Sequence, residues 1–449
     1  MSSIRFFIAL WVSKLSVIVI NIIAKGRGTN LPGQVALRID PLFVQHMKGI
    51  DPDKAVFVTG TNGKSTTVNL LHHVFTSSGK KVCANLDGAN MLTGVATALI
   101  KDSGLSGRIR SEYVVMETDE RYLKFIRKQL PAHQLIITNI QKDQTQRNGE
   151  PGVISRKITE ALGPDLTAFV NQDEPRSFAL GESAGRAVSY AVKENSKSYH
   201  KESDFFSVTM PCARCHEPIV FHAHNIENIG PFVCPSCGYG GERKADYLVD
   251  EVDYEGHTFT SSGRKYQFNF STPYFLYCYI SVLAAAKEMG LSEDQIAHGF
   301  ETFSDLRGRL ATKSIAGKTL NYIKMKQENP ETIQSSLNLV AEDKEDKIFL
   351  FGLDETLDYY PAFTNTLALF DVDFRPVLRS GLNHFVCMSK AIGRAAAVRM
   401  MYDGFDPDHM TVIPASYEED VAGALEPLDD KPVYLVEEIP YYKKPKKQN

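Results

Sequence analysis

The chain has 449 residues, too many for a single hydrophobic core, so roughly two or three domains are expected. Its hydrophobic fraction of 43% and charged fraction of 23% are typical of a soluble globular protein. The net charge of −4 provides no basic field for nucleic acid, so we expect no nucleic-acid partner.

The first predicted element is an apolar helix at residues 5–25. Its apolar span is about 18 residues, near the lower limit for crossing a bilayer. Lys14 lies near its middle, and a central lysine costs about 2.5–3.5 kcal/mol on membrane insertion. We therefore favour a buried or membrane-surface helix over a span, which leaves peripheral membrane contact open. The Gly- and Pro-containing stretch at 25–33 ends the helix.

Strands and helices then alternate along the chain. Apolar strands are expected at 55–60, 81–86, 113–118 and 134–140, with helices at 65–79 and 121–130. Further strands follow at 347–353, 384–389, 410–415 and 432–439. This alternation predicts parallel βαβ units, hence two α/β domains, the second smaller and Rossmann-like.

A phosphate-binding loop is predicted at residues 59–67, TGTNGKSTT, which fits G-x-x-G-K-[ST] between a strand and a helix. Such a loop presents backbone N–H groups to phosphate, and the helix N-terminus adds positive potential. Lys64 would reach the β- and γ-phosphates, and the Ser65 hydroxyl would coordinate Mg²⁺. The predicted nucleotide contacts are Gly60, Thr61, Asn62, Gly63, Lys64, Ser65 and Thr66. The alternative is a glycine turn with an incidental lysine.

Four cysteines form two Cys-x-x-Cys pairs separated by eighteen residues: Cys212, Cys215, Cys234 and Cys237. This spacing predicts a zinc ribbon, in which four thiolates surround one tetrahedral ion. Four thiolates leave no open coordination position, so we expect a structural zinc. Paired thiols that bind metal indicate a reducing compartment, and we expect the chain to be cytoplasmic.

The short loop TNGKST resembles the ATP loop of the Mur ligases, which activate a carboxylate as an acyl phosphate and then couple an amine. The resemblance implies that Glu117, in METDE (116–120), binds Mg²⁺ and takes part in catalysis with Lys64. The alternative for Glu117 is a solvated carboxylate at a strand edge. It further implies that Asn139, Asp143 and Arg309 lie near the nucleotide.

The cysteine insert and the short C-terminal domain resemble the MurT group of Mur ligase-like subunits, and the likeness covers nearly the whole chain. It implies an N-terminal helical segment (1–50), a Mur ligase-type ATPase domain (51–312) with a zinc-ribbon insertion (200–245), and a C-terminal α/β domain (313–449). The implied reaction is ATP-dependent amidation of the α-carboxylate of D-glutamate in lipid II, during peptidoglycan synthesis. Ammonia would come from a GatD-like glutaminase in a stable heterodimer.

The sequence departs from this group at three places. Asn365 stands where an aspartate is expected to complete the glutaminase triad, and an amide cannot stabilise an imidazolium as a carboxylate does. Asp354 and Asp358 lie nearby, and we assign the catalytic role to Asp358. Phe275 and Cys278 replace two asparagines of the adenine site, and Glu331 replaces a glycine after Asn-Pro.

Two other functions remain open. The chain could be a stand-alone ATP-dependent amide ligase acting on a muropeptide, or a catalytically altered scaffold paralog. We favour the amidotransferase subunit because the phosphate loop and Glu117 are intact.

Overall fold

The computed structural model describes residues 2–23, 30–86, 88–143, 145, 149–200, 210–241, 244–269, 272–304, 310–325, 329–352, 369, 371–388, 392–413 and 418–438. The chain divides into two compact units. The first comprises Met1–Ile140, Pro151–Lys201 and Thr209–Asp305. The second comprises Gln141–Glu150, Glu202–Val208 and Leu306–Asn449.

A parallel sheet forms the centre of the first unit, with strand order β2-β3-β1-β4-β5-β6-β9. Its strands are β2 (Val82–Ala84), β3 (Tyr113–Glu117), β1 (Ala55–Thr59), β4 (Gln134–Ile137), β5 (Thr167–Asn171), β6 (Arg186–Val192) and β9 (Tyr247–Val249). All five residues of β1 are buried. Both faces of the sheet are therefore covered, as expected for a parallel sheet with helical crossovers.

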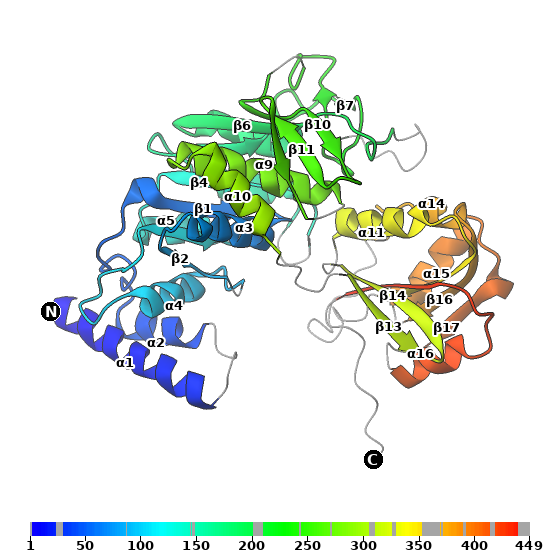
Figure 1. The fold of residues 1–449 in the computed structure, drawn as a ribbon, viewed down its shortest axis with the longest axis horizontal. Helices are drawn as coiled ribbons and strands as arrows, with labels where there is room; N and C mark the ends of the chain where they lie inside the picture. Colours follow the sequence, from blue (N-terminus) through cyan, green and yellow to red (C-terminus); the bar gives the residue numbers. More distant parts are fainter. Residues whose placement is uncertain are drawn as a thin grey trace. The chain divides into compact units, whose positions relative to one another are not determined.

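Helices pack on both faces of this sheet (Figure 1). One core contains α3 (Lys64–Ser77), α9 (Pro273–Glu288) and α10 (Glu293–Thr302). The other contains α4 (Leu92–Asp102), α5 (Leu123–Gln129), α7 (Pro151–Thr159) and α8 (Pro175–Leu180). Along β1, Val56 and Val58 enter the first core and Phe57 the second, as the alternation of side chains in a strand requires.

The N-terminal helix α1 (Ser2–Ile23) packs beside α2 (Leu31–Ile39) and α4. Its inner face buries Phe6, Ala9 and Leu10, whereas eight large apolar side chains are exposed: Ile4, Ile8, Trp11, Val12, Leu15, Ile18, Val19 and Ile22. The ammonium of Lys14 donates to the carbonyls of Ile100 (2.8 Å) and Ser103 (2.7 Å), and burial lowers its pKa. Among the described residues, α1 is the one helix long and apolar enough to cross a membrane.

Two small sheets complete the first unit. β7 (Val220–Phe221) pairs antiparallel with β8 (Phe232–Val233), within the cysteine insert. β10 (Glu251–Asp253), β11 (Thr258–Ser261) and β12 (Arg264–Gln267) form an antiparallel meander that leads into α9.

The second unit holds a sheet with strand order β13-β14-β18-β15-β16-β17. The strands are β13 (Leu310–Ile315), β14 (Lys318–Met325), β18 (Val433–Glu438), β15 (Lys347–Gly352), β16 (Leu382–Met388) and β17 (Met410–Ile413). The helices described in this unit are α11 (Pro330–Glu342), α14 (Arg375–Leu378), α15 (Ile392–Tyr402) and α16 (Glu418–Leu425). The four predicted strands are confirmed, and the antiparallel β13–β14 pair was not predicted.

Candidate active site and cysteine cluster

The phosphate loop connects the end of β1 to the start of α3 and depends on two glycines. Gly60 has φ 121° and Gly63 has φ 85°, backbone conformations that are unfavourable for residues with a Cβ atom. A Cβ atom at Gly60 would lie 2.3 Å from Thr138 Oγ1 and 2.8 Å from the carbonyl oxygen of Asn139. The loop therefore lies directly against the end of β4, and only glycine fits there.

Asn139 holds the loop in place through three hydrogen bonds. Its carbonyl accepts from the Thr61 N–H (2.8 Å), and its Oδ1 accepts from the Asn62 N–H (3.0 Å). Its Nδ2 donates back to the carbonyl of Asn62 (3.0 Å). The resemblance to the Mur ligases predicts that Asn139 lies near the nucleotide. In the structure, Asn139 supports the backbone of the loop.

Lys64 and Ser65, the first residues of α3, each meet a glutamate at or just beyond the end of β3. Lys64 Nζ forms an ion pair with Glu120 Oε1 (2.7 Å). Ser65 Oγ donates to Glu117 Oε2 (2.7 Å), and Asn90 Nδ2 donates to Glu117 Oε1 (3.3 Å). Glu117 is 4% exposed. The sequence predicted the meeting of Ser65 and Glu117 but not the role of Glu120.

This arrangement fits a magnesium ion. A buried carboxylate is costly unless it meets a cation or a proton. Ser65 and Glu117 present two adjacent oxygen atoms, the ligand type that Mg²⁺ takes together with substrate phosphates. Asn85 fixes the backbone of Glu117 at the end of β3. Its side chain accepts from the Glu117 N–H (2.7 Å) and donates to the Glu117 carbonyl (2.9 Å).

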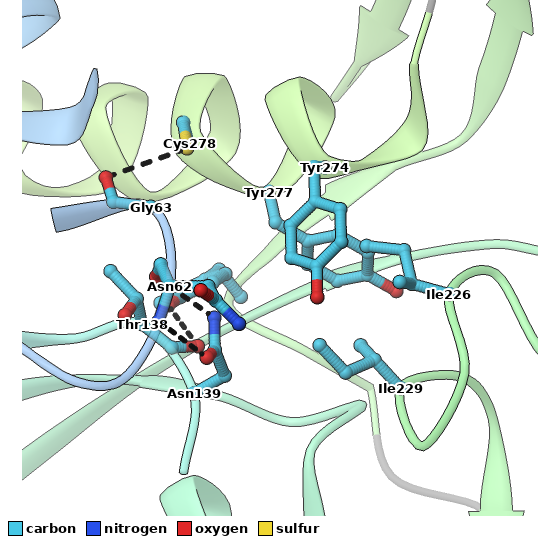
Figure 2. Close-up of a pocket in the computed structure, with 10 residues that line it drawn as sticks. Asn62, Gly63, Thr138, Asn139, Ile226, Ile229, Tyr274, Tyr277 and Cys278 are labelled. Carbon is cyan, nitrogen blue, oxygen red and sulfur yellow. Dashed lines mark hydrogen bonds between the residues drawn. The ribbon is translucent and has the colours of Figure 1, made fainter. Parts of the chain in front are cut away.

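A small pocket lies beside the loop. Figure 2 shows its lining, which includes Asn62, Gly63, Thr138, Asn139, Ile226, Ile229, Tyr274, Tyr277 and Cys278. Cys278 lies 3.9 Å from the carbonyl oxygen of Gly63, so α9 packs closely on the loop. Phe275 belongs to the partly buried margin of the core.

The four cysteine sulfurs lie within 4.8 Å of one another, with Cys212–Cys237 at 3.7 Å and Cys215–Cys234 at 3.5 Å. Four ligands about 2.3 Å from a tetrahedral zinc would be about 3.8 Å apart, so the donor set fits zinc. Two similar turns build the cluster. The backbone N–H of His216 donates to the carbonyl of Cys212 (3.0 Å), and the backbone N–H of Gly238 donates to the carbonyl of Cys234 (2.8 Å). Both residues have positive φ, 65° and 72°.

Several predicted residues are not part of these clusters. Arg309, Asp354, Asp358 and Asn365 lie outside the described residues. Asp143 belongs to the segment grouped with the second unit. In that unit, Asn329 caps α11 by accepting from the Thr332 N–H (2.8 Å), which explains the Asn-Pro sequence there, and the following Glu331 is buried.

The similarity of the chain to a family model and to solved structures defines its class. Residues 58–229 match the family model of the Mur ligase middle domain. The fold is similar to a pseudomurein peptide ligase type C from Methanothermus fervidus, with a TM-score of 0.67 and 18% identity, covering 88% of this chain and 78% of that one. It is also similar to MurF from Acinetobacter baumannii, with a TM-score of 0.59 and 15% identity, covering 90% and 77%. The fold is that of a Mur-type ligase.

The C-terminal region narrows the class. Residues 327–438 match the family model of the MurT ligase C-terminal domain. The chain is 26% identical over 364 residues, 80% of each chain, to the MurT subunit of a glutamine-hydrolysing lipid II isoglutaminyl synthase from Staphylococcus aureus. It is 27% identical over 320 residues, 70% of each chain, to the MurT subunit from Streptococcus pneumoniae. The predicted resemblance to MurT is confirmed.

Proposed function

We propose that this chain is the ATP-dependent subunit of an amidotransferase that converts D-glutamate in lipid II to D-isoglutamine. The observation that carries the proposal is that Lys64 lies against the glycine loop while the neighbouring Ser65 contacts Glu117. The matches to the Mur ligase middle domain, to the MurT C-terminal domain and to a MurT subunit support lipid II as the substrate and a GatD-like glutaminase as the partner.

In the proposed reaction, the γ-phosphoryl group of ATP passes to the α-carboxylate, and ADP leaves. Ammonia then attacks the acyl carbon of the resulting acyl phosphate, and phosphate leaves. Backbone N–H groups of residues 63–66, at the start of α3, hold the phosphates, and Lys64 exchanges Glu120 for phosphate oxygens. Ser65 and Glu117 would hold Mg²⁺, which would supply Lewis-acid stabilisation of phosphate charge. Asp143, Arg309 and Asp358 stay as predictions.

The test is co-expression with a GatD-like glutaminase, followed by mass spectrometry of lipid II incubated with ATP and glutamine. We expect a product in which one carboxyl has become an amide, and none with the Lys64→Ala variant. Absence of amidation with the cognate glutaminase would contradict the proposal. ATP turnover that needs a free amino acid and no partner would instead support a stand-alone ligase.

A scaffold function makes the opposite prediction in cells. If Lys64→Ala leaves the D-isoglutamine content unchanged while deletion of the chain lowers it, the chain acts without its ATPase site.

We further propose that the four cysteines hold one structural zinc and that α1 lies on the cytoplasmic face of the membrane. The eight exposed apolar side chains of α1 form one face of the helix, whereas Lys14 is tied to carbonyls of the domain on the other. A helix anchored in this way can lie at an interface but not span a bilayer without leaving its domain.

The membrane contact can be tested by flotation with anionic vesicles. We expect Leu15→Glu combined with Ile18→Glu to abolish flotation, because both side chains are on the exposed face. Phe125→Glu, an equally exposed apolar position on α5, serves as the control and should float. Equal flotation of both variants would contradict membrane contact.

A further inference from the structure

The segment between the two cysteine pairs, residues 216–233, folds into a hairpin that we call the cysteine hairpin. Near the cysteines, Val220 pairs with Val233 and Phe221 with Phe232. At the tip, Ile226 and Ile229 exchange backbone hydrogen bonds of 3.0 and 2.7 Å. The hairpin therefore links the metal-binding cysteines at one end to a two-isoleucine turn at the other.

The tip is fixed inside the ATPase core. Asn225 Nδ2 donates to the Val192 carbonyl (2.7 Å) and to Tyr277 Oη (2.9 Å). The Gly230 N–H donates to the carbonyl of Asp173 (3.0 Å), whose carboxylate accepts from Tyr277 Oη (2.8 Å). Ile226 and Ile229, only 4% and 1% exposed, belong to the main hydrophobic core. The tip of the predicted zinc-ribbon insertion is therefore built into the core of the domain.

The cysteine end has little apolar support of its own. Its cluster of buried residues consists of Met210, Cys212, Ile219, Phe232, Cys234 and Tyr239, two of which are cysteines of the quartet. Backbone hydrogen bonds close the two cysteine turns: the Cys212 N–H donates to the Glu217 carbonyl (2.8 Å) and the Cys234 N–H to the Tyr239 carbonyl (2.7 Å). The hairpin between them is joined by the His222 N–H, which donates to the Pro231 carbonyl (2.7 Å). In so small a cluster, metal binding contributes much of the folding free energy.

The tip also forms one wall of the pocket beside the phosphate loop. Figure 2 shows Ile226 and Ile229 facing Tyr274 and Tyr277 across the pocket, with Asn62 and Gly63 alongside. Aromatic and aliphatic walls next to a triphosphate-binding loop are the surroundings that a nucleobase requires.

We propose that the Ile226–Ile229 tip is the base-contacting wall of the nucleotide site, and that metal held by the four cysteines positions it. This inference rests on the proposed function, because it assumes that the loop binds a nucleoside triphosphate. Metal occupancy then controls the affinity for the base and leaves the affinity for the phosphates unchanged, since the hydrogen bonds described for the loop come from the loop itself, Asn139, Glu117 and Glu120 and not from the hairpin.

Two ligands separate these contributions: ATP, and inorganic tripolyphosphate, which has no base. Calorimetry with Mg²⁺ would compare zinc-loaded full-length chain, chelator-treated chain and the Cys237→Ser variant, whose altered side chain is exposed. Removing the metal should weaken ATP binding about tenfold, the loss of part of one apolar wall, and change tripolyphosphate binding less than about twofold.

A second variant tests the wall without disturbing the metal. Ile229→Ala should retain one zinc, measured with a chromophoric chelator, and should also weaken ATP but not tripolyphosphate about tenfold. Val220→Ala, half-exposed on the same hairpin, is the matched control and should bind both ligands as the wild type does.

Three results would overturn the inference. ATP affinity that is independent of metal and of Ile229 would show that the tip does not contact the base. A parallel loss of ATP and tripolyphosphate binding would show that the metal acts on the whole fold. If the zinc-loaded chain bound neither ligand, the proposed function would fail as well, a pattern distinct from the other two.

Discussion

The phosphate loop and the pocket beside it adjoin each other but differ in how the chain builds them. The loop consists of consecutive residues, and its shape follows from Gly60 and Gly63 and from hydrogen bonds to Asn139. The pocket takes its walls from five separate segments: the loop itself, the end of β4, strand β6, the tip of the cysteine hairpin and α9. One part is specified by backbone geometry, the other by the packing of remote side chains.

Because of this difference, substitutions in the loop and around the pocket should affect different properties of the protein. Changes in the loop should act on phosphate binding and catalysis with little effect on stability. Changes around the pocket should act on stability, because its side chains also belong to the main core. The four predictions below test this distinction.

The largest effect is expected for Lys64→Ala. Because Lys64 is the cation placed to meet phosphate charge, we expect ATP turnover to fall about 10²–10³-fold, as for the loss of one transition-state donor. Lys101→Ala, an exposed lysine on α4, is the control and should retain activity. The measurement is phosphate release by the co-expressed pair. A variant with near-normal turnover would remove the catalytic role from the loop.

Gly60→Ala should be next in size. A side chain at φ 121° and 2.3 Å from Thr138 Oγ1 would displace the loop, and returning it to the phosphate-binding conformation would cost about 3 kcal/mol, the upper end of backbone strain. We expect tripolyphosphate affinity to fall roughly a hundredfold with little change in melting temperature. Gly79→Ala, also at positive φ but with no atom within 4 Å, should not alter affinity. Equal losses in the two variants would argue against a specific loop geometry.

Asp173→Asn tests the pocket side. Burial raises the pKa of Asp173 from 3.8 to about 7, so between these values the folded state holds a proton that the unfolded state has lost. The free energy of unfolding should therefore fall as pH rises through this window, by about 2 kcal/mol between roughly pH 5 and pH 6.5. Asparagine cannot titrate, so its variant should lack this fall.

Urea unfolding at several pH values measures this difference. Glu255→Gln, at an exposed position, should keep the wild-type pH dependence. Parallel pH profiles for the wild type and Asp173→Asn would mean that Asp173 titrates normally.

The smallest effect is expected for Tyr190→Phe. The buried hydroxyl donates to the Ile137 carbonyl (2.9 Å), and its loss should lower the free energy of unfolding by about 1 kcal/mol. Because the hydroxyl donates to carbonyls of Ile137 and Thr138 and not to a residue of the phosphate loop, tripolyphosphate affinity should not change. A large loss of that affinity would show that the loop and the pocket are not separable.

The sequence predicts the features built from neighbouring residues better than the contacts between distant ones. The loop, the parallel sheet and the grouping of the four cysteines were predicted, since each depends on residues close together in the chain. The pairing of Lys64 with Glu120, the support from Asn139 and the pocket wall of Ile226 and Ile229 were not. These contacts join residues 56, 77 and more than 160 positions apart, and short-range patterns carry no information about them.

The attachment of α1 bears on how this chain can be prepared for experiments. Its apolar outer side invites removal of the first 23 residues to improve solubility. That truncation would uncover Phe43, Val44 and Ala36, which now pack with Phe6 and Leu10, and would free the carbonyls that Lys14 satisfies. Polar replacements at outward positions such as Ile18 should instead give a better-behaved sample with the domain interior intact.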